Sequence, residues 1–319
     1  MPKIKIALLA GGISGEREVS FKTGEQIYNA LDKKKYIIYK YDPKTDLKRF
    51  FLDAINKKFN LVFPALHGPF GEDGRLQGML DMIGVPYVFS GTLASALAMD
   101  KYKTKIIAKN AGLIVAKDII LNKPPVRGKT EYDLNQIINE LSLPIVVKPV
   151  ELGSSVGASI ANSAKELEKG IALAFKHGGR IMLEQYIAGR ELSVAVIGNE
   201  QKAEPLPVIE IIPKISSWFD YKAKYEAGGS REVCPAEIPD DIRNKAQKSA
   251  VKIFKIIGCK DVARADFIWS KKGNKIYFLE INTIPGMTQT SLVPQAAKAA
   301  GMDFSEFLDK LIKKAMIIG

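Results

Sequence analysis

Three oxygen-bearing side chains late in the chain, Asp266, Glu280 and Asn282, have the types and spacing of a magnesium site. Carboxylate and amide oxygens without His or Cys suit Mg²⁺, which keeps some waters and usually takes the rest of its shell from substrate phosphates. Arg264 stands two residues before Asp266, so both point to one face of an extended strand. A fixed cation beside metal-binding carboxylates is expected where phosphate charge is handled. The alternative is a surface hairpin with a polar outer face, because alternating strands produce such faces in many proteins.

A β-hairpin is the element that must position these side chains. Two runs of strand-forming residues flank a polar stretch that contains Gly273, which is the composition of strand, turn and strand. A turn centred near Gly273 places Asp266 opposite Glu280. Glu280 and Asn282 are two residues apart and therefore share a face of their strand. We expect all three oxygen ligands on one face of the hairpin.

A candidate nucleotide loop lies in the middle of the chain. Residues 143–149 form a predicted buried strand that carries Lys148, and Gly153-Ser154-Ser155-Val156-Gly157 follows it. Small residues with hydroxyls and free backbone N–H groups let such a loop close over phosphates, while the lysine supplies charge. A glycine-rich loop alone is a weak signal. A charged residue in a buried strand strengthens it, because that charge demands a partner.

A domain boundary is expected near residues 185–189, between an apolar strand at 181–187 and a new sheet that starts at 189–194. Glu184 and Glu191 bracket this boundary. Acidic residues in such a crevice can accept from an adenine amino group or a ribose hydroxyl. They could equally be charges at the rim of the crevice.

The first part of the chain alternates strands and helices, as an open α/β sheet requires. A buried strand at 3–10 runs into a glycine-rich turn at 11–15, and an amphipathic helix follows at about 18–31. The spacing of these glycines fits neither the dinucleotide fingerprint nor the P-loop, which argues against an NAD enzyme. A later strand at 60–66 ends in His67-Gly68, at the edge of the sheet where such folds place ligands.

Composition sets the frame for these motifs. The chain has 319 residues, of which 46% are hydrophobic, enough for two or three domains. No uncharged apolar run approaches the length of a membrane span, so we expect no membrane partner and a cytoplasmic protein. Cys234 and Cys259 have neither pair spacing nor a nearby His, which disfavours disulfides and zinc.

The net charge of +12 raises nucleic-acid binding as a rival function. The lysines, however, are dispersed through amphipathic stretches such as 31–36 and 308–314, where solvated helix faces are the usual explanation. No aromatic-interleaved basic motif or zinc-finger spacing occurs. We therefore predict no nucleic-acid partner.

Six motifs occur in order along essentially the whole chain. They are Gly11-Gly12 with Ser14-Gly15-Glu16-Arg17-Glu18-Val19-Ser20, Ala65-Leu66-His67-Gly68 with Gly71-Glu72-Asp73-Gly74, Met99-Asp100-Lys101, Val147-Lys148-Pro149 with Gly153-Ser154-Ser155-Val156-Gly157, Tyr221-Lys222-Ala223-Lys224-Tyr225, and Glu280-Ile281-Asn282-Thr283-Ile284-Pro285-Gly286-Met287-Thr288 with Ser291-Leu292-Val293-Pro294. Together they resemble the D-alanine–D-alanine ligases of the ATP-grasp superfamily. Six motifs in one order are far more specific than any single glycine loop.

The resemblance implies an α/β protein with the three-domain ATP-grasp fold. An amino-terminal open parallel α/β substrate domain would cover residues 1–99. A central subdomain with the glycine-rich phosphate loop would cover 100–186, and a carboxyl-terminal subdomain with the magnesium site would cover 187–319. ATP would bind between the second and third of these. We also expect a homodimer.

The resemblance implies roles at ATP and the metals as follows. Asp266, Glu280 and Asn282 would hold two Mg²⁺ or Mn²⁺ ions. The residues implied at the nucleotide are Lys101 and Lys148 on the phosphates, Ser155 in the phosphate loop, Glu184, Gln185 and Ile187 at the adenine, and Glu191 at the ribose. Gln185 departs from the family pattern, because better-known members have a lysine there. Glu151-Leu152 is a second departure, at the entry to the glycine loop.

The resemblance also implies which residues handle two D-alanine molecules. Glu16 would bind the ammonium of the first, near His67, and a network of Glu16, Ser154 and Tyr225 would close the site. The other implied residues are Arg264 and the Gly286 backbone N–H at the oxyanion, Lys224 at the substrate, and Ser291 and Leu292 at the carboxylate of the second D-alanine.

The implied reaction is ATP-dependent formation of D-alanyl-D-alanine for peptidoglycan precursors, through a D-alanyl phosphate and with release of ADP and phosphate. An amide requires such activation of the carboxylate in water. One rival is a D-alanine–D-lactate or other ATP-grasp carboxylate ligase; tyrosine after Lys224, here Tyr225, is the family's mark of an amine second substrate. The other rival is a non-catalytic nucleotide-binding or nucleic-acid-binding protein with the same fold.

Overall fold

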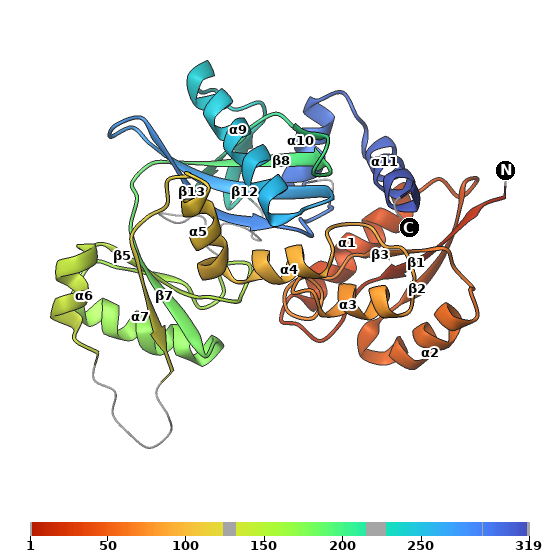
Figure 1. The fold of residues 1–319 in the computed structure, drawn as a ribbon, viewed down its shortest axis with the longest axis horizontal. Coiled ribbons are helices and arrows are strands. Elements are labelled where there is room, and N and C mark those ends of the chain that lie inside the picture. Colours follow the sequence, from red (N-terminus) through yellow and green to blue (C-terminus); the bar gives the residue numbers. More distant parts are fainter. Residues whose placement is uncertain (1, 124–131, 215–227, 289, 318–319) are drawn as a thin grey trace.

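The computed structural model describes residues 2–123, 132–214, 228–288 and 290–317. Three β-sheets follow one another along the chain, each with helices packed on it (Figure 1). Tyr225 and Lys224, two of the predicted site residues, lie outside the described residues. The mixed α/β class with a parallel amino-terminal sheet is confirmed.

The first sheet is parallel, with strand order β2-β1-β3. Its middle strand is buried along most of its length and is mostly apolar, as parallel strands covered on both faces require. Its elements are β1 (Ile4–Leu9), α1 (Arg17–Ala30), β2 (Tyr36–Tyr41), α2 (Pro43–Ile55), β3 (Leu61–Pro64) and α3 (Arg75–Met82).

The second sheet is antiparallel, with strand order β4-β7-β5-β6. Its two helices start at side-chain caps, where Asp133 and Ser163 each accept from a backbone N–H of the first turn. The elements are β4 (Asp118–Asn122), α6 (Leu134–Leu141), β5 (Ile145–Pro149), β6 (Ser159–Ala161), α7 (Ala164–His177) and β7 (Arg180–Gln185).

The third sheet is the largest, with strand order β11-β10-β8-β12-β13 and β9 paired to β8. Helix α9 covers one face through a stripe of buried Ile, Ala and Phe residues. Its elements are β8 (Arg190–Gly198), β9 (Ala203–Pro205), β10 (Ile209–Pro213), β11 (Ser230–Val233), α9 (Asp240–Ile257), β12 (Asp261–Ser270), β13 (Lys275–Asn282), α10 (Leu292–Ala299) and α11 (Phe304–Ile317).

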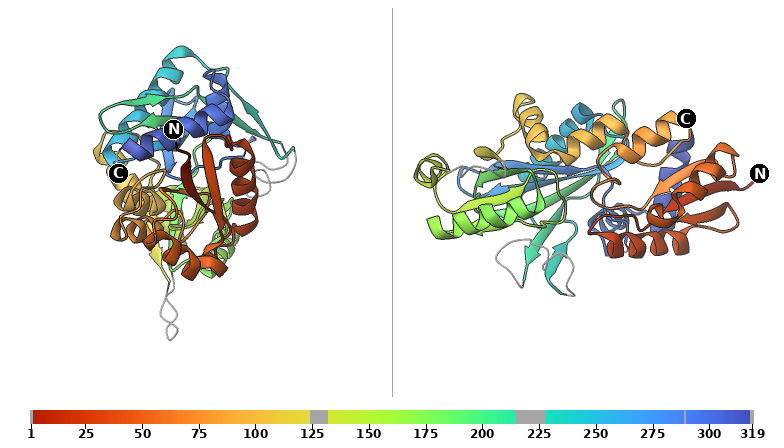
Figure 2. Two further views of the ribbon diagram at one scale, coloured as in Figure 1. Left: turned by 90° about the vertical axis from the view of Figure 1, so that its right-hand side faces the viewer. Right: turned by 90° about the horizontal axis from the view of Figure 1, so that it is seen from below.

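Two helices, α4 (Thr92–Met99) and α5 (Lys101–Asn110), follow the first sheet in the chain. The expected domain break at 99/100 falls between them, yet both pack against β13 and α9, and their alanines join the core of the third sheet. Figure 2 shows this helix pair alongside the long strands of the third sheet. Helix α5 therefore connects the third sheet to the start of the second. The three-domain division stays a prediction.

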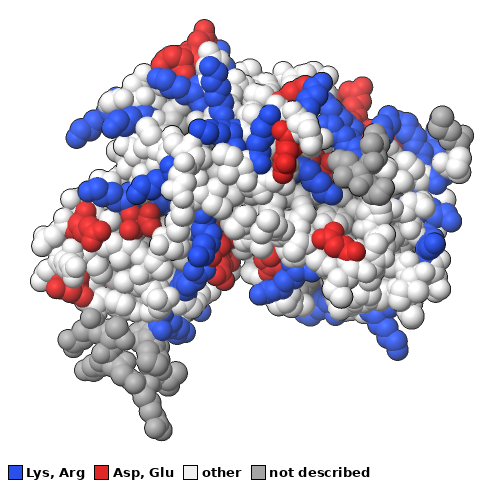
Figure 3. Space-filling view, in the orientation of Figure 1, with Lys and Arg blue, Asp and Glu red and all other residues white. Residues whose placement is uncertain are grey.

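The surface carries the excess of basic residues in dispersed form. On the face drawn in Figure 3, Lys and Arg side chains are scattered over all parts of the molecule, with Asp and Glu among them. Within the described residues, no helix has both the length and the apolarity needed to cross a membrane.

Candidate active site

The hairpin of β12 and β13 has the register expected from its sequence. Asp266 pairs with Glu280 and Arg264 pairs with Asn282, and a register shift follows directly after Asp266. The turn forms around Gly273, whose φ of 75° suits glycine. All four functional side chains are therefore brought to one end of the hairpin.

Arg264 and Asp266 form a tight pair on β12. Arg264 Nη2 donates to Asp266 Oδ2 over 2.7 Å and Nε to Oδ1 over 3.0 Å, a two-pronged geometry that suits guanidinium and carboxylate. Ser193 Oγ on the neighbouring strand β8 donates to Oδ1 over 2.6 Å. Burial opposes the charge of Arg264, but Asp266 and Glu280 raise its pKa above the usual value. Arg264 is thus a permanently charged group fixed at the wall of the site.

The donor set at this end of the hairpin fits Mg²⁺. Glu280 and Asn282 line a cavity between the first and third sheets, and Asp266 is the residue paired with Glu280 on the neighbouring strand. In the ranges that the structure describes, no three His, Cys, Asp or Glu side chains gather into a metal-binding group. An ion held here by two carboxylates and an amide would need further ligands from phosphates and water.

The larger cavity, of about 470 Å³, lies between the first and third sheets. Its walls combine carboxylates, an arginine and hydroxyls, as a site for small zwitterions requires. Nine of the residues predicted from the sequence line it, namely Glu16, His67, Ser154, Arg264, Glu280, Asn282, Gly286, Ser291 and Leu292.

A second cavity, of about 150 Å³, lies between the second and third sheets. Val146, Ile160, Ile268 and Leu279 give it the apolar walls that a flat ring prefers. All seven residues predicted at the nucleotide line it, namely Lys101, Lys148, Ser155, Glu184, Gln185, Ile187 and Glu191. Glu280 and Gly153 belong to both cavities, so the two spaces adjoin at the predicted metal ligand.

The strand lysine has the partner that its burial demands. Lys148 Nζ lies 2.6 Å from Glu184 Oε2, and Lys105 Nζ lies 2.6 Å from the other oxygen of Glu184. Burial alone would raise the pKa of Glu184, but the two lysines lower it. Burial likewise opposes the charge of Lys148, and Glu184 raises its pKa. Both groups are charged at neutral pH.

Glu16 projects into the larger cavity from the start of α1, where it is the N-cap residue. Ser154, from the glycine loop of the second sheet, donates a hydrogen bond to Glu16 Oε1. Gly68 approaches from a third direction, because a Cβ built on it would lie 2.7 Å from Glu16 Oε2. The loops after β1, β3 and β5 therefore converge on this one carboxylate.

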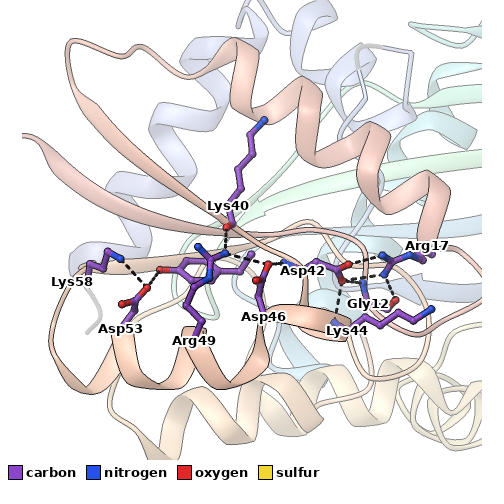
Figure 4. Close-up of polar contacts among 10 residues, drawn as sticks. Gly12, Arg17, Lys40, Asp42, Lys44, Asp46, Arg49, Asp53 and Lys58 are labelled. Atoms are coloured by element: carbon purple, nitrogen blue, oxygen red, sulfur yellow. Dashed lines mark hydrogen bonds and ion pairs between the residues drawn. The ribbon is translucent and has the colours of Figure 1, made fainter.

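The glycine-rich turn that leads to Glu16 is fixed by Asp42 at the end of β2 (Figure 4). Asp42 accepts from Gly12 N over 2.9 Å and pairs with Arg17, whose Nη1 also donates to Gly12 O over 2.6 Å. Burial alone would raise the pKa of Asp42, but Arg17 and the backbone N–H groups of Gly12 and Lys44 lower it to about 2.

Ser291 stands at the N-terminus of α10 and ties down the turn before it. Its Oγ accepts from Thr288 N over 3.1 Å and lies 2.7 Å from Thr288 Oγ1. The free N–H groups at the start of a helix favour an anion. This position suits the carboxylate of the second D-alanine, which the family resemblance places at Ser291 and Leu292.

Glu72 and Lys105 are site residues that the sequence reasoning did not assign. Glu72 lines the larger cavity, accepts from Gly68 N over 3.0 Å and has Oε1 at 3.5 Å from His67 Nδ1. Burial raises its pKa. Its place in the motif that begins at His67 was a usable signal. Lys105 had none, because it sits in a lysine-rich segment.

Comparison with known proteins decides the family. The model of the D-ala D-ala ligase C-terminus matches residues 107–313, and that of the D-ala D-ala ligase N-terminus matches residues 39–90. D-alanine–D-alanine ligases of Syntrophobacter fumaroxidans and Desulfotalea psychrophila are each 46% identical to the chain; both alignments cover 98% of it, and 98% and 94% of the relatives. The chain belongs to the D-alanine–D-alanine ligase family.

Solved structures of this ligase family share the fold. The D-alanine–D-alanine ligase of Bacillus anthracis complexed with ATP has a TM-score of 0.84 at 31% identity, with 100% of this chain and 98% of that chain covered. The VanG D-Ala:D-Ser ligase of Enterococcus faecalis has a TM-score of 0.82 at 32% identity, with 98% of this chain and 100% of that chain covered. Membership in the ligase family and the ATP-grasp fold expected from the motifs are confirmed.

Proposed function

We propose that the chain joins two D-alanine molecules into D-alanyl-D-alanine with ATP as the activating substrate, for peptidoglycan precursor synthesis. The observation that carries this proposal is the adjoining pair of cavities. The predicted nucleotide residues line one and the predicted amino-acid residues line the other, and Glu280 belongs to both. A γ-phosphate that reaches past Glu280 would meet a carboxylate held in the larger cavity.

The first step activates the carboxylate of the first D-alanine. Glu16 binds the ammonium group of this D-alanine. One carboxylate oxygen of the D-alanine attacks the γ-phosphorus as ADP leaves. Lys101 and Lys148 at the nucleotide cavity offset the charge that develops on the phosphates. Magnesium or manganese ions held by Asp266, Glu280 and Asn282 would supply further charge neutralisation on the phosphate oxygens. The product of this step is D-alanyl phosphate.

The second step forms the amide. The carboxylate of the second D-alanine lies at the N-terminus of α10, on Ser291 and Leu292. Its free amine attacks the acyl carbon, the amine loses a proton, and phosphate leaves. Arg264 and the Gly286 N–H stabilise the oxyanion of the tetrahedral intermediate. Acyl phosphate hydrolyses in water, so the site must exclude water during this step. The hydrogen bond from Ser154 to Glu16 joins the glycine loop to α1 and helps to close the site.

Phosphate release with ATP and Mg²⁺ tests this function directly. We expect release that depends on D-alanine, with D-alanyl-D-alanine identified by mass spectrometry, and little release with L-alanine. Phosphate release without D-alanine, or with no dipeptide formed, would overturn the proposal. Sedimentation of the purified protein tests the homodimer that we include in it.

The choice of the second substrate needs its own test. The D-Ala:D-Ser ligase has almost the same TM-score as the D-alanine–D-alanine ligase, so the fold alone does not separate them. Tyr225 after Lys224 supports an amine acceptor, although both lie outside the described residues. Equimolar D-alanine, D-serine and D-lactate offered together should give mainly D-alanyl-D-alanine.

A further inference from the structure

Lys105 on α5 is a fully buried lysine that the proposed mechanism does not use. Only 2% of its surface is exposed. Its Nζ lies 2.6 Å from Glu184 Oε1, 2.8 Å from Asp118 Oδ1 and 3.0 Å from the carbonyl oxygen of Ala116. An ammonium group has three hydrogens to donate, and these three acceptors use all of them.

The position of Lys105 solves an electrostatic problem of the second sheet. Asp118 on β4 and Glu184 on β7 are directly paired residues of neighbouring antiparallel strands, and like charges in that arrangement destabilise a sheet. Lys105 reaches both carboxylates from outside the sheet, and Lys148 on β5 takes the second oxygen of Glu184. The four groups carry two positive and two negative charges, so their charges cancel.

Glu184 is therefore held as a carboxylate at the nucleotide cavity, where it can accept hydrogen bonds and cannot donate them. Each oxygen uses one acceptor site on a lysine and keeps another. A purine with a 6-amino group can donate to such a carboxylate, whereas a purine with a 6-oxo group would place oxygen against oxygen.

We propose that Lys105 is a positioning residue for nucleotide selection: it holds Glu184 as a hydrogen-bond acceptor and thereby favours 6-aminopurine over 6-oxopurine nucleotides. The inference rests on the proposed function, because it places the purine beside Glu184. It concerns a lysine that would touch no substrate itself. Lys101, one helical turn earlier on α5, instead lies 3.5 Å from Glu280, on the phosphate side.

Removal of Lys105 changes the charge balance in a defined way. Lys148 then faces two carboxylates, Glu184 and Asp118, and Glu280 adds a third negative charge from β13. Lys101 Nζ lies 3.5 Å from Glu280 Oε2 and pairs with that third charge. The least costly response is that the Glu184–Asp118 pair takes up one proton. A protonated Glu184 gains a donor, and that donor can bond the oxygen of a 6-oxopurine.

The test compares ATP with ITP, whose base differs from adenine at position 6, in Lys105→Met. Methionine keeps the length of the apolar stem and a similar helix propensity. We expect the ratio of kcat/KM for ATP to that for ITP to fall about tenfold. The fall should deepen as the pH is lowered, while the wild-type ratio stays flat. Equal losses for both nucleotides, or an unchanged ratio in the folded variant, would overturn the inference.

Two further variants keep the test decisive. Asp118→Asn leaves Lys105 in place with fewer competing acceptors. The ratio of kcat/KM for ATP to that for ITP in this variant should therefore stay at or above the wild-type ratio. Lys105→Met/Asp118→Asn restores the charge balance, and its ratio should recover. A fall in Asp118→Asn contradicts the inference even if Lys105→Met does not fold. Lys109→Met is the matched control, because Lys109 is exposed one turn further along α5.

Nucleotide binding without D-alanine separates this inference from the proposed function. Calorimetric titration with ATP or ITP and Mg²⁺ measures base selection when no ligation occurs. If the wild type prefers ATP but makes no dipeptide, the proposed function fails and the role of Lys105 is still tested by binding. If dipeptide forms and Lys105→Met keeps the full preference for ATP, the inference alone fails.

Discussion

Replacing Asp42 by Asn removes one charge from the turn that leads to Glu16. The folded-state pKa of Asp42 is about 2, against 3.8 for the isolated group. A difference of this size corresponds to about 2.5 kcal/mol as an upper bound. The side chain of Arg17 is 28% exposed, so solvent screening reduces the value and we expect a loss of about 1–2 kcal/mol. Asparagine also turns an N–H donor toward Arg17.

The pH dependence of this loss has a definite sign. A depressed folded pKa means that Asp42 contributes its full stability above the unfolded value of 3.8 and loses it as the pH falls toward 2. Denaturant unfolding of wild type and Asp42→Asn should therefore differ by a constant amount from neutral pH down to about pH 5. Below about pH 4 the two proteins should converge. A difference that grows on acidification would refute the assignment of the charge.

The same variant should affect catalysis through Glu16. Asp42 holds the backbone of Gly12 and the guanidinium of Arg17, so its loss should raise the KM for D-alanine several-fold with little effect on the KM for ATP. Asp53→Asn is the matched control on the same helix, because Asp53 pairs with Lys58 at the far end of α2 (Figure 4). Equal KM values for D-alanine in the two variants would refute a role for Asp42 in positioning Glu16.

Three other substitutions test separate parts of the site. Glu280→Gln should cut D-alanine-dependent phosphate release by about 100-fold or more while thermal unfolding stays near that of the wild type; near-normal turnover would show that the metal ligand is misassigned. Gly68→Ala should raise the KM for D-alanine, since φ is 74° there and the new Cβ would lie 2.7 Å from Glu16; unchanged kinetics would mean that the two loops do not meet at the substrate. Tyr225→Phe should lower dipeptide synthesis and make D-lactate a detectable competitor at mildly acidic pH, where less of the D-alanine amine is free. Mass spectrometry of the products across pH measures the dipeptide-to-depsipeptide ratio. An unchanged ratio would exclude a role for Tyr225 in the choice of the second substrate.

The hairpin could be predicted from the sequence because its information is local. Side chains alternate with period two, and a turn residue near the centre sets which residues face each other. Gly273 marks the turn, and the register shift directly after Asp266 brings that residue opposite Glu280. The small parallel sheet follows similarly, and β1 and α1 lie within one residue of their expected bounds. Residues 107–313 and 39–90 then match family models, as the six motifs implied.

The buried charges could not be predicted in the same way, because their partners are distant in sequence. Lys105 lies among lysines on a helix that resembles a solvated face, and only the fold brings it to Glu184, 79 residues away. Asp42 likewise reaches Gly12 across 30 residues. Helix α5 packs on the third sheet, a tertiary preference that its lysine-rich pattern does not reveal. Local patterns identify elements, whereas long-range ion pairs emerge only from packing.

The balance of charge around the nucleotide cavity links these features to the metal. Ion pairs in and beside this cavity join Lys101, Lys105, Lys148 and Arg264 to Glu280, Asp118, Glu184 and Asp266, and Glu191 adds a further negative charge to the lining. The net charge of +12 is therefore not concentrated in this cluster. A triphosphate brings several negative charges to a cavity whose cations are already paired with carboxylates, and Lys148 must share its charge between Glu184 and phosphate. Divalent cations that arrive with ATP would offset this excess, which is the physical reason to expect cooperative binding of nucleotide and magnesium.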